Sequence, residues 1–299
     1  MTLQSTDTKS RKKISLVLSG GGARGIAHIG VIEELEKQGY QIHAIAGSSM
    51  GALVGGIYAA GKLKEFKEWI LELDKMDVFK LIDFTLIRNG FVKGDKVFNK
   101  LKEFVPDINI EDLSIAYFAI ATDVTNKKEF VFNNGNLLKA MRASVAIPNV
   151  LTPVKMDEMV LIDGGVINNI PLNHAKRSDD DLLIAVNVNA NIPVPKKQDQ
   201  KVHNNSSFYN GLLNKFKKSL HKILPAEKKD LGYFDIMNDS FEIMRNELVR
   251  LALEKTPPDV LIETPHDLCS IYDFYKADVL IERGRIATEQ SLKAFRDKL

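Results

Sequence analysis

Gly47-Ser-Ser-Met-Gly51 is the stretch that decides how this chain folds. The β-like run Gln41–Ala46 precedes it, and a helix of small and apolar residues, Met50–Ala60, follows it. A G-x-S-x-G pentapeptide between a strand and a helix can hold its central serine on a tight, strained turn with Oγ projecting. The flanking glycines leave room for such a backbone. The pattern therefore predicts that Ser49 is a nucleophile.

Strands and helices alternate on both sides of this turn. Apolar runs that we expect to be strands lie at Ile14–Ser19, Ile115–Ala121, Glu129–Phe132, Met159–Ile162, Leu182–Val188 and Asp259–Glu263. Periodicity predicts helices at Ile26–Gln38, within Leu63–Phe84, at Asp95–Val105, at Asn136–Ser144 and at the end of the chain. This alternation predicts an α/β fold whose mostly parallel central sheet carries helices on both faces.

The bulk composition sets outer limits. A chain of 299 residues is long enough for one large α/β domain, or for a domain and a cap. With 44% hydrophobic residues, 27% charged residues and a net charge of +2, the global charge favours no particular partner. The single cysteine, Cys269, excludes an intrachain disulfide framework and a cysteine-rich zinc site.

Two segments bear on where the protein is found. Residues 1–13 are a polar, basic tail that is not followed by the apolar h-region of a signal peptide, so we expect no secretory signal and a cytoplasmic protein. Residues 38–61 contain no charged residue, but glycines and serines interrupt them. A strand, a turn and a buried helix fit this run better than a membrane-spanning helix. We therefore expect a soluble protein or one peripheral to the membrane.

A second glycine-rich segment, Gly20-Gly-Gly-Ala-Arg-Gly25, joins the first expected strand to the first expected helix. Consecutive backbone N–H groups at a helix N-terminus favour an anion. The segment satisfies the dinucleotide fingerprint G-x-G-x-x-G, which also requires an acidic residue near the end of the next strand. That strand ends in Ala44-Ile-Ala-Gly47 without a carboxylate. The remaining interpretations are an oxyanion hole and a glycine turn that serves packing alone.

A nucleophilic serine needs a base. The six histidines are scattered without metal-ligand spacing, and His28, one turn into the first helix, favours a structural role. A conventional hydrolase triad requires a late histidine, for which His266 is the candidate in the right part of the chain. Asp163 is the better partner, because it ends an apolar strand and two glycines follow it. The structural alternative for Asp163 is a turn-forming Asp-Gly pair.

Together, these segments resemble the patatin-like phospholipase family, which carries a G-G-G-x-R-G oxyanion loop, a G-x-S-x-G elbow and a D-G-[GA] catalytic aspartate. Gly20–Gly25, Gly47–Gly51 and Asp163–Gly165 match these motifs in order. Secondary signatures match at Ala121–Val124, Arg142–Pro148, Thr152-Pro153 and Asn168–Pro171. The resemblance covers roughly residues 14–188 and, more loosely, the last strand and helix. Residues 191–256 have no counterpart that we can name.

The resemblance implies a three-layer α/β/α patatin-like fold, with a single domain over residues 14–299. It also implies a Ser–Asp dyad without histidine, in which Ser49 attacks an ester carbonyl and Asp163 accepts its proton. The implied oxyanion donors are the N–H groups of Gly21, Gly22 and Ala23, with Arg24 and Gly25 in support, while Gly164 and Gly165 shape the turn after the aspartate. The resemblance further implies a phospholipid or lysophospholipid as substrate and a mechanism that requires no metal, cofactor or nucleic acid.

Residues 191–256 contain a basic amphipathic helix at Gly211–Leu224. One face is apolar and includes Phe216, and the opposite side carries Lys215, Lys217, Lys218 and Lys222 with no acidic residue. Such a helix suits an anionic lipid surface, so we expect a lid or a membrane contact here. The alternative is a surface helix that packs its apolar face on the core.

Two other functions remain open from the residues alone. The same dyad serves a soluble carboxylesterase or acyltransferase that acts on non-lipid esters. A catalytically silent membrane-binding scaffold is the alternative from another class of protein. The joint presence of the glycine loop, Ser49 and Asp163 disfavours the silent scaffold, because an inactive copy need not retain all three.

Overall fold

The computed structural model describes residues 12–81, 94–148, 150–194 and 233–298. The chain divides into two compact units, Met1–Ile192 with Met244–Leu299, and Pro193–Ile243. The first unit contains the sheet and the three motifs described above.

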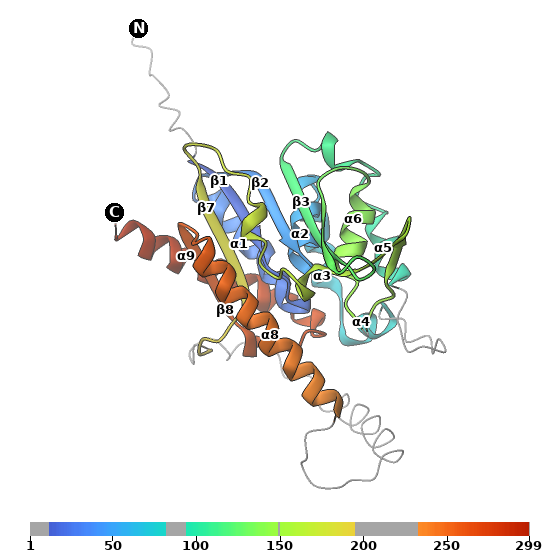
Figure 1. The fold of residues 1–299 in the computed structure, drawn as a ribbon. Coiled ribbons are helices and arrows are strands. Elements are labelled where there is room, and N and C mark those ends of the chain that lie inside the picture. The colour runs from blue at the N-terminus through green and yellow to red at the C-terminus, as the bar shows by residue number, and fades with distance from the viewer. Residues whose placement is uncertain (1–11, 82–93, 149, 195–232, 299) are drawn as a thin grey trace, which may run out of the picture. The chain divides into compact units, whose positions relative to one another are not determined.

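An eight-stranded sheet forms the centre of the first unit (Figure 1). Its strands are β1 (Lys12–Leu18), β2 (Tyr40–Ser48), β3 (Ala116–Asp123), β4 (Lys128–Phe132), β5 (Val154–Met156), β6 (Met159–Asp163), β7 (Leu182–Ala190) and β8 (Val260–Pro265). The order is β5-β6-β3-β2-β1-β7-β8, with β4 paired to β3 off this path. From β3 to β8 along this order all neighbours are parallel, whereas β4, β5 and β6 pair antiparallel. The predicted mostly parallel sheet is confirmed.

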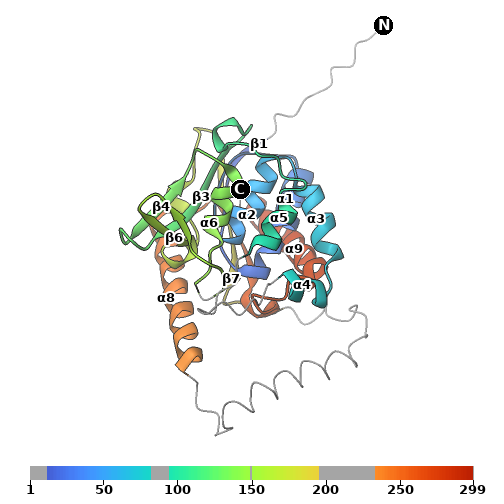
Figure 2. The same cartoon turned by 90° about the vertical axis from the view of Figure 1, so that its right-hand side faces the viewer.

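Helices cover both faces of the sheet. The α-helices are α1 (Ala27–Lys37), α2 (Met50–Ala59), α3 (Leu63–Glu72), α4 (Lys75–Leu81), α5 (Asp95–Leu101), α6 (Leu137–Ser144), α8 (Tyr233–Lys255) and α9 (Ala277–Arg296). Side chains alternate between faces along a strand. Leu16 and Leu18 of β1 therefore pack in the cluster that contains α1, α2 and α9, whereas Val17 packs in a second cluster with Val249 of α8. Figure 2 shows α1, α3 and α9 together on one side of the strands.

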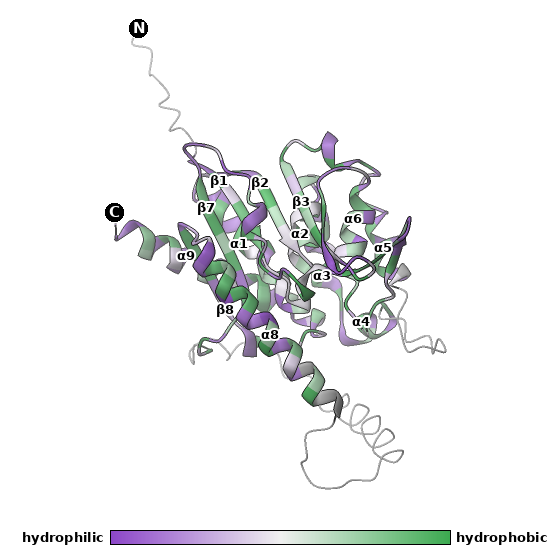
Figure 3. Cartoon of the chain, viewed as in Figure 1, coloured by the Kyte–Doolittle hydropathy of each residue, from purple (hydrophilic) through white to green (hydrophobic). Residues whose placement is uncertain are grey.

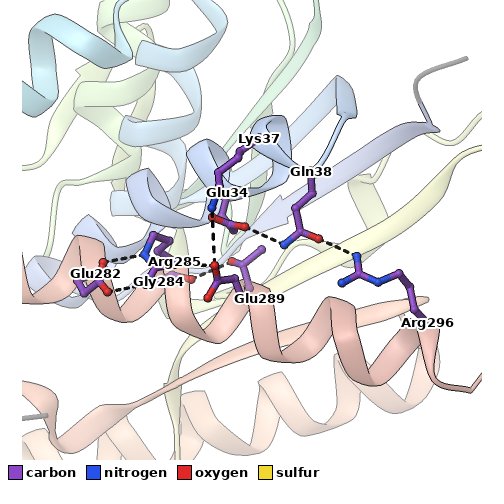
Figure 4. A network of polar contacts seen from close by, with 9 residues as sticks. Glu34, Lys37, Gln38, Glu282, Gly284, Arg285, Glu289 and Arg296 are labelled. Atoms are coloured by element: carbon purple, nitrogen blue, oxygen red, sulfur yellow. Dashed lines mark hydrogen bonds and ion pairs between the residues drawn. The ribbon is translucent and has the colours of Figure 1, made fainter. Parts of the chain in front are cut away.

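Helices α1 and α9 cross at very close range. A Cβ at Gly284 would overlap the carbonyl oxygen of Ala27, and one at Gly30 would overlap that of Ile281. Hydrophobic and hydrophilic residues alternate along α9, as in a helix with one buried face (Figure 3). Polar contacts flank the crossing (Figure 4), namely Lys37 to Glu34, Gln38 to Glu34, Arg285 to Glu282 and Arg296 to Gln38. Only glycine fits where the two backbones meet.

Gly284→Ala should therefore lower the stability of the fold. The added methyl group must push α9 away from α1, and overpacking of this kind costs about 1–3 kcal/mol. A chemical denaturation curve should show the loss as an earlier midpoint. Gln290→Ala, at an exposed position of the same helix, is the matched control and should change the midpoint little. Equal stability of the two variants would show that the crossing tolerates a side chain.

The second unit, Pro193–Ile243, lies within the insert that the sequence suggests at residues 191–256, and that insert stays a prediction. Helix α8 runs through its last part, and from Met244 onward α8 belongs to the first unit. Buried Val249 accounts for this, since it packs on the sheet with Ala185. The expected membrane-contact residues Lys215, Phe216, Lys217, Lys218 and Lys222 lie outside the described residues. Within the described ranges, each helix is too short or too polar to cross a membrane.

Candidate active site

Ser49 lies on a sharp turn between β2 and α2. Its φ of 52° and ψ of −124° form a backbone conformation that costs a non-glycine residue roughly 1–3 kcal/mol. The next turn of chain passes so close to β1 that a Cβ at Gly51 would overlap the carbonyl oxygen of Leu18. Because Ser49 is the N-cap of α2, the positive end of the helix dipole faces it.

Ser144 holds the elbow from the opposite side. Its Oγ accepts a hydrogen bond from the Ser49 N–H at 3.0 Å, and its hydroxyl donates to the Ile120 carbonyl at 2.5 Å. Ser144 is completely buried at the end of α6. The strained peptide of the serine is therefore fixed by β3 and α6 as well as by its own strand.

Asp163 ends β6 and stands close to Ser49. Its Oδ1 accepts the Gly165 N–H at 2.7 Å, and the Thr122 hydroxyl donates to its main-chain carbonyl at 3.0 Å. The buried Oδ2 has no well-formed hydrogen bond from the described residues. The hydroxyl of Ser49 nevertheless lies near enough to stabilise the carboxylate and lower its pKa. Such loose contacts between catalytic groups are common in the absence of substrate.

Burial decides the protonation of Asp163. Its side chain is 5% exposed, and desolvation disfavours a charged carboxylate. This effect raises the pKa of Asp163 to about 6, although Ser49, the Gly165 N–H and the positive charge of Arg245 each lower it. A carboxyl group with a pKa near neutrality is a better base than an ordinary aspartate.

The glycine loop lies against this pair. The short 3₁₀ helix η1 (Gly22–Ile26) begins within it, ahead of α1. A Cβ at Gly20 would lie 2.9 Å from the Cβ of Ser49, which places the start of the loop beside the nucleophile. The N–H groups of Gly21 and Gly22 donate to no described residue. These two donors of the loop are therefore unused within the described part of the chain.

Ala23 does not fit the role that the resemblance suggests. Its N–H donates to the carbonyl of Ile271 at 2.9 Å, so this donor is already used. Arg24 is buried, with 5% of its surface exposed, and its side chain supports the loop through hydrogen bonds. Its Nε donates to the Gly21 carbonyl at 3.4 Å and its guanidinium to the His266 carbonyl at 3.2 Å.

Two of the histidines, His28 and His266, have partners other than Ser49. His28 Nε2 bonds the carbonyl of Ser19 at 2.8 Å, and complete burial lowers its pKa to about 4, so the ring is neutral. The ring of His266 contacts the Ala190 carbonyl at 3.3 Å and the Asp267 carboxylate at 3.0 Å. Neither of these two rings forms a hydrogen bond with Ser49 in the described part of the chain.

An apolar cavity of about 140 Å³ opens at Ser49. Its walls come from η1 and α2 to α5, together with the segments that follow α6 and β8. Among the lining residues are Gly22, Ile26, Met50, Leu53, Phe66, Trp69, Ile70, Val97, Phe98, Ile147 and Phe274. Ser49 and Gly22 are both part of the lining, so the serine elbow and the glycine loop share the cavity. Its walls suit a hydrocarbon chain.

Sequence reasoning assigned no role to several residues that shape this site. Ser144 and Asn169 lie within the quoted signatures, and Asn189 is a polar residue at the end of a buried strand. Arg245, whose charge acts on Asp163, lies on α8. For Asn189, the sequence offers one signal of a functional role. Asn187 and Asn189 are polar residues within an otherwise apolar strand.

Comparisons with known proteins agree with these motifs. A family model described as patatin-like phospholipase matches residues 16–176. An uncharacterized NTE family protein of Mycobacterium tuberculosis is 32% identical to this chain over an alignment of 334 residues. The alignment covers 96% of this chain and 93% of that protein. Lysophospholipase NTE1 of Candida glabrata is 28% identical over 92% of this chain and 16% of its own length. The chain belongs to the patatin-like phospholipase family.

Proposed function

We propose that this protein hydrolyses carboxylic esters of lipids, as a phospholipase A or lysophospholipase, through a Ser49–Asp163 dyad. Family membership supports a lipid ester hydrolase, and the name of the Candida glabrata relative supports the lysophospholipase type. One observation carries the proposal above all. A strained serine lines an apolar cavity and lies near enough to a buried carboxylate to lower the pKa of that carboxylate.

In the acylation step, the Oγ of Ser49 attacks the ester carbonyl carbon and its proton passes to Asp163. The resulting tetrahedral intermediate collapses when the C–O bond of the leaving group breaks, and the alcohol takes the proton back from Asp163. In the deacylation step, Asp163 accepts a proton from water as the water oxygen attacks the acyl-enzyme. Ser49 then leaves with that proton, and the fatty acid is released.

The negative oxygen of each intermediate is stabilised by the N–H groups of Gly21 and Gly22 and by the N-terminus of α2. Loss of one such donor typically costs about 3 kcal/mol of transition-state stabilisation. These donors are fixed before the substrate binds, so the reaction needs little reorganisation of the protein. This preorganisation offsets the modest basicity of a carboxylate.

The acyl chain of the substrate occupies the apolar cavity, and the head group remains at its mouth. The basic segment 211–224, which lies outside the described residues, is proposed to contact the lipid surface that supplies the substrate. Its lysines suit anionic head groups, and its apolar positions suit the boundary of the acyl chains. The protein then acts at the membrane as a peripheral enzyme.

The direct test combines a fluorophosphonate probe with a lipid panel. The probe should label the protein, and peptide mapping should place the adduct on Ser49. Phospholipids, lysophospholipids and short acyl esters should then be compared by kcat/KM, with the lipid esters preferred. Labelling without lipid hydrolysis would favour a carboxylesterase for other esters. Absence of both would favour a silent scaffold.

The cavity predicts a dependence on chain length. Val97 on α5 is half-buried and lines the cavity, whereas Asn99 on the same helix is exposed and does not. Val97→Trp should fill the cavity and lower kcat/KM for a palmitoyl ester at least about tenfold more than for a butyryl ester. Asn99→Trp is the matched control and should leave the ratio of the two esters unchanged. An equal effect on both esters in Val97→Trp would place the acyl chain elsewhere.

A further inference from the structure

Two buried asparagines, Asn169 and Asn189, meet the same carbonyl group at the start of the glycine loop. Asn189 Nδ2 donates to the Gly20 carbonyl at 2.6 Å, and Asn169 Nδ2 donates to the same oxygen at 3.4 Å. The Gly20 N–H in turn donates to the main-chain carbonyl of Asn169 at 3.0 Å. Both polar groups of the Gly20 main chain are therefore held, the carbonyl by the two asparagine side chains and the N–H by the Asn169 carbonyl.

The held carbonyl determines the direction of the next N–H group. The Gly20 carbonyl and the Gly21 N–H belong to one planar trans peptide, in which they point in opposite directions. A carbonyl fixed toward the asparagines fixes the Gly21 N–H on the opposite side. That N–H donates to no described residue, and Gly20 lies against Ser49. The unused Gly21 N–H thus belongs to a peptide group whose orientation is fixed by the two asparagine side chains.

We propose that Asn189, assisted by Asn169, is a positioning residue that aims the Gly21 N–H at the oxyanion formed when Ser49 attacks the ester carbonyl. The proposal rests on the hydrolase function proposed above. In this proposal the asparagines help to stabilise the transition state, and they do not change the binding of the substrate in its ground state. The asparagines themselves touch neither substrate nor nucleophile in this mechanism.

The burial of Asn189 supports a functional demand. The side chain is 5% exposed near the end of β7, and its Oδ1 is buried with no hydrogen-bond partner among the described residues. The Asn189 N–H is also held, by Asn187 Oδ1 at 3.1 Å. A buried amide that leaves one polar atom unpaired costs free energy that an apolar residue would avoid. We infer that Asn189 occupies this position because its Nδ2 hydrogen bond to the Gly20 carbonyl offsets that cost.

Asn189→Asp tests the proposal, because aspartate has the same shape but no N–H to donate. We expect kcat to fall about 10²- to 10³-fold, as for the loss of an oxyanion donor, with KM nearly unchanged. The affinity for a trifluoromethyl ketone analogue, which forms a tetrahedral adduct with Ser49, should fall in parallel. The affinity for an ether-lipid analogue, which has no carbonyl, should stay unchanged. Asn169→Ala should show the same pattern with a smaller effect, because its bond is longer.

Asn168→Ala is the matched control. This neighbouring asparagine bonds Glu129 and Asn173 and does not contact Gly20, so kcat should remain at the wild-type value. If Asn189→Asp does not fold, Asn189→Ala and Asn169→Ala provide the same comparison. An unchanged kcat in the folded variants overturns the proposal. An equal loss of affinity for both analogues also overturns it, because it indicates general damage to the site.

The failure of this proposal can be told apart from failure of the hydrolase function. If the wild-type protein hydrolyses no ester, or if Ser49→Ala retains hydrolysis, the proposed function itself is wrong. If the wild-type protein is active, Ser49→Ala is inactive and the asparagine variants behave as wild type, only the positioning role is wrong. The wild type, Ser49→Ala and the asparagine variants should therefore be assayed side by side on the same ester.

Discussion

Ser49→Ala is expected to abolish ester hydrolysis and labelling by the fluorophosphonate probe. In the proposed mechanism the Ser49 hydroxyl forms the bond to the acyl group, and alanine has no atom that can do so. Loss of the serine nucleophile in such sites lowers kcat by at least about 10⁴-fold. The ether-lipid analogue should still bind, because the cavity is intact. Residual hydrolysis at more than a trace in a carefully purified variant would indicate a different nucleophile.

A glycine at the same position separates chemistry from strain. Ser49→Gly removes the same hydroxyl but also relieves the φ of 52°, which alanine must keep. Strain of this kind is worth roughly 1–3 kcal/mol, and part of that gain is lost to the greater freedom of glycine in the unfolded chain. We expect Ser49→Gly to melt at a higher temperature than Ser49→Ala, with both variants inactive. A lower melting temperature for the glycine variant would show that the turn is not strained.

The elbow could be predicted from sequence because its determinants are local. The apolar run before Ser49, the small residues after it and the close-packed glycines all lie within one short segment. The same holds for Asp163, where an apolar strand ends in a turn. The division of Leu63–Phe84 into α3 and α4 was also locally encoded, although it was not predicted. Asp74 Oδ1 accepts the Asp77 N–H at 2.8 Å and starts α4.

The support of the site could not be predicted, because its partners are distant in the chain. Ser144 meets Ser49 across 95 positions, and Asn189 meets Gly20 across 169. The N–H of Ala23 matches its neighbours in sequence pattern, yet the carbonyl of Ile271 removes it from the available donors. Which backbone groups stay free is decided by tertiary packing. A motif can identify a glycine loop, but only the fold shows which of its donors are already used by other groups.

Asp163→Asn is expected to remove nearly all hydrolysis while keeping the shape of the site. Asparagine can still accept the Gly165 N–H through Oδ1, but it cannot take the proton of Ser49. Loss of the acid partner in a serine hydrolase lowers kcat about 10⁴-fold, and a similar loss is expected here. His266→Ala is the control, because a triad would lose activity there instead. Substantial hydrolysis in Asp163→Asn with loss in His266→Ala would replace the dyad by a triad.

The raised pKa of Asp163 adds a pH dependence to this prediction. Only the carboxylate is a base, so kcat/KM of the wild-type protein should rise with pH up to about 6, where Asp163 titrates, and then level off. A lack of any pH dependence around this value would place the base elsewhere. The profile should be recorded with an uncharged ester, so that titration of the substrate does not contribute.

The same pKa shift means that the charged form of Asp163 lowers the stability of the folded protein at pH values above about 6. Its pKa is about 6 in the folded protein and 3.8 as the ordinary value. The folded protein therefore binds the proton more tightly, and the stability from this group is full below the ordinary pKa and is lost as pH rises through about 6. A shift of this size corresponds to about 3 kcal/mol.

The melting temperature of Asp163→Asn, relative to that of the wild type at the same pH, should therefore increase between about pH 4 and about pH 8. Comparing the two proteins at each pH cancels the contribution of buried His28, and a constant difference would contradict the shift. A variant that is more stable and inactive at neutral pH would show that the fold carries an unfavourable charge where catalysis needs a base.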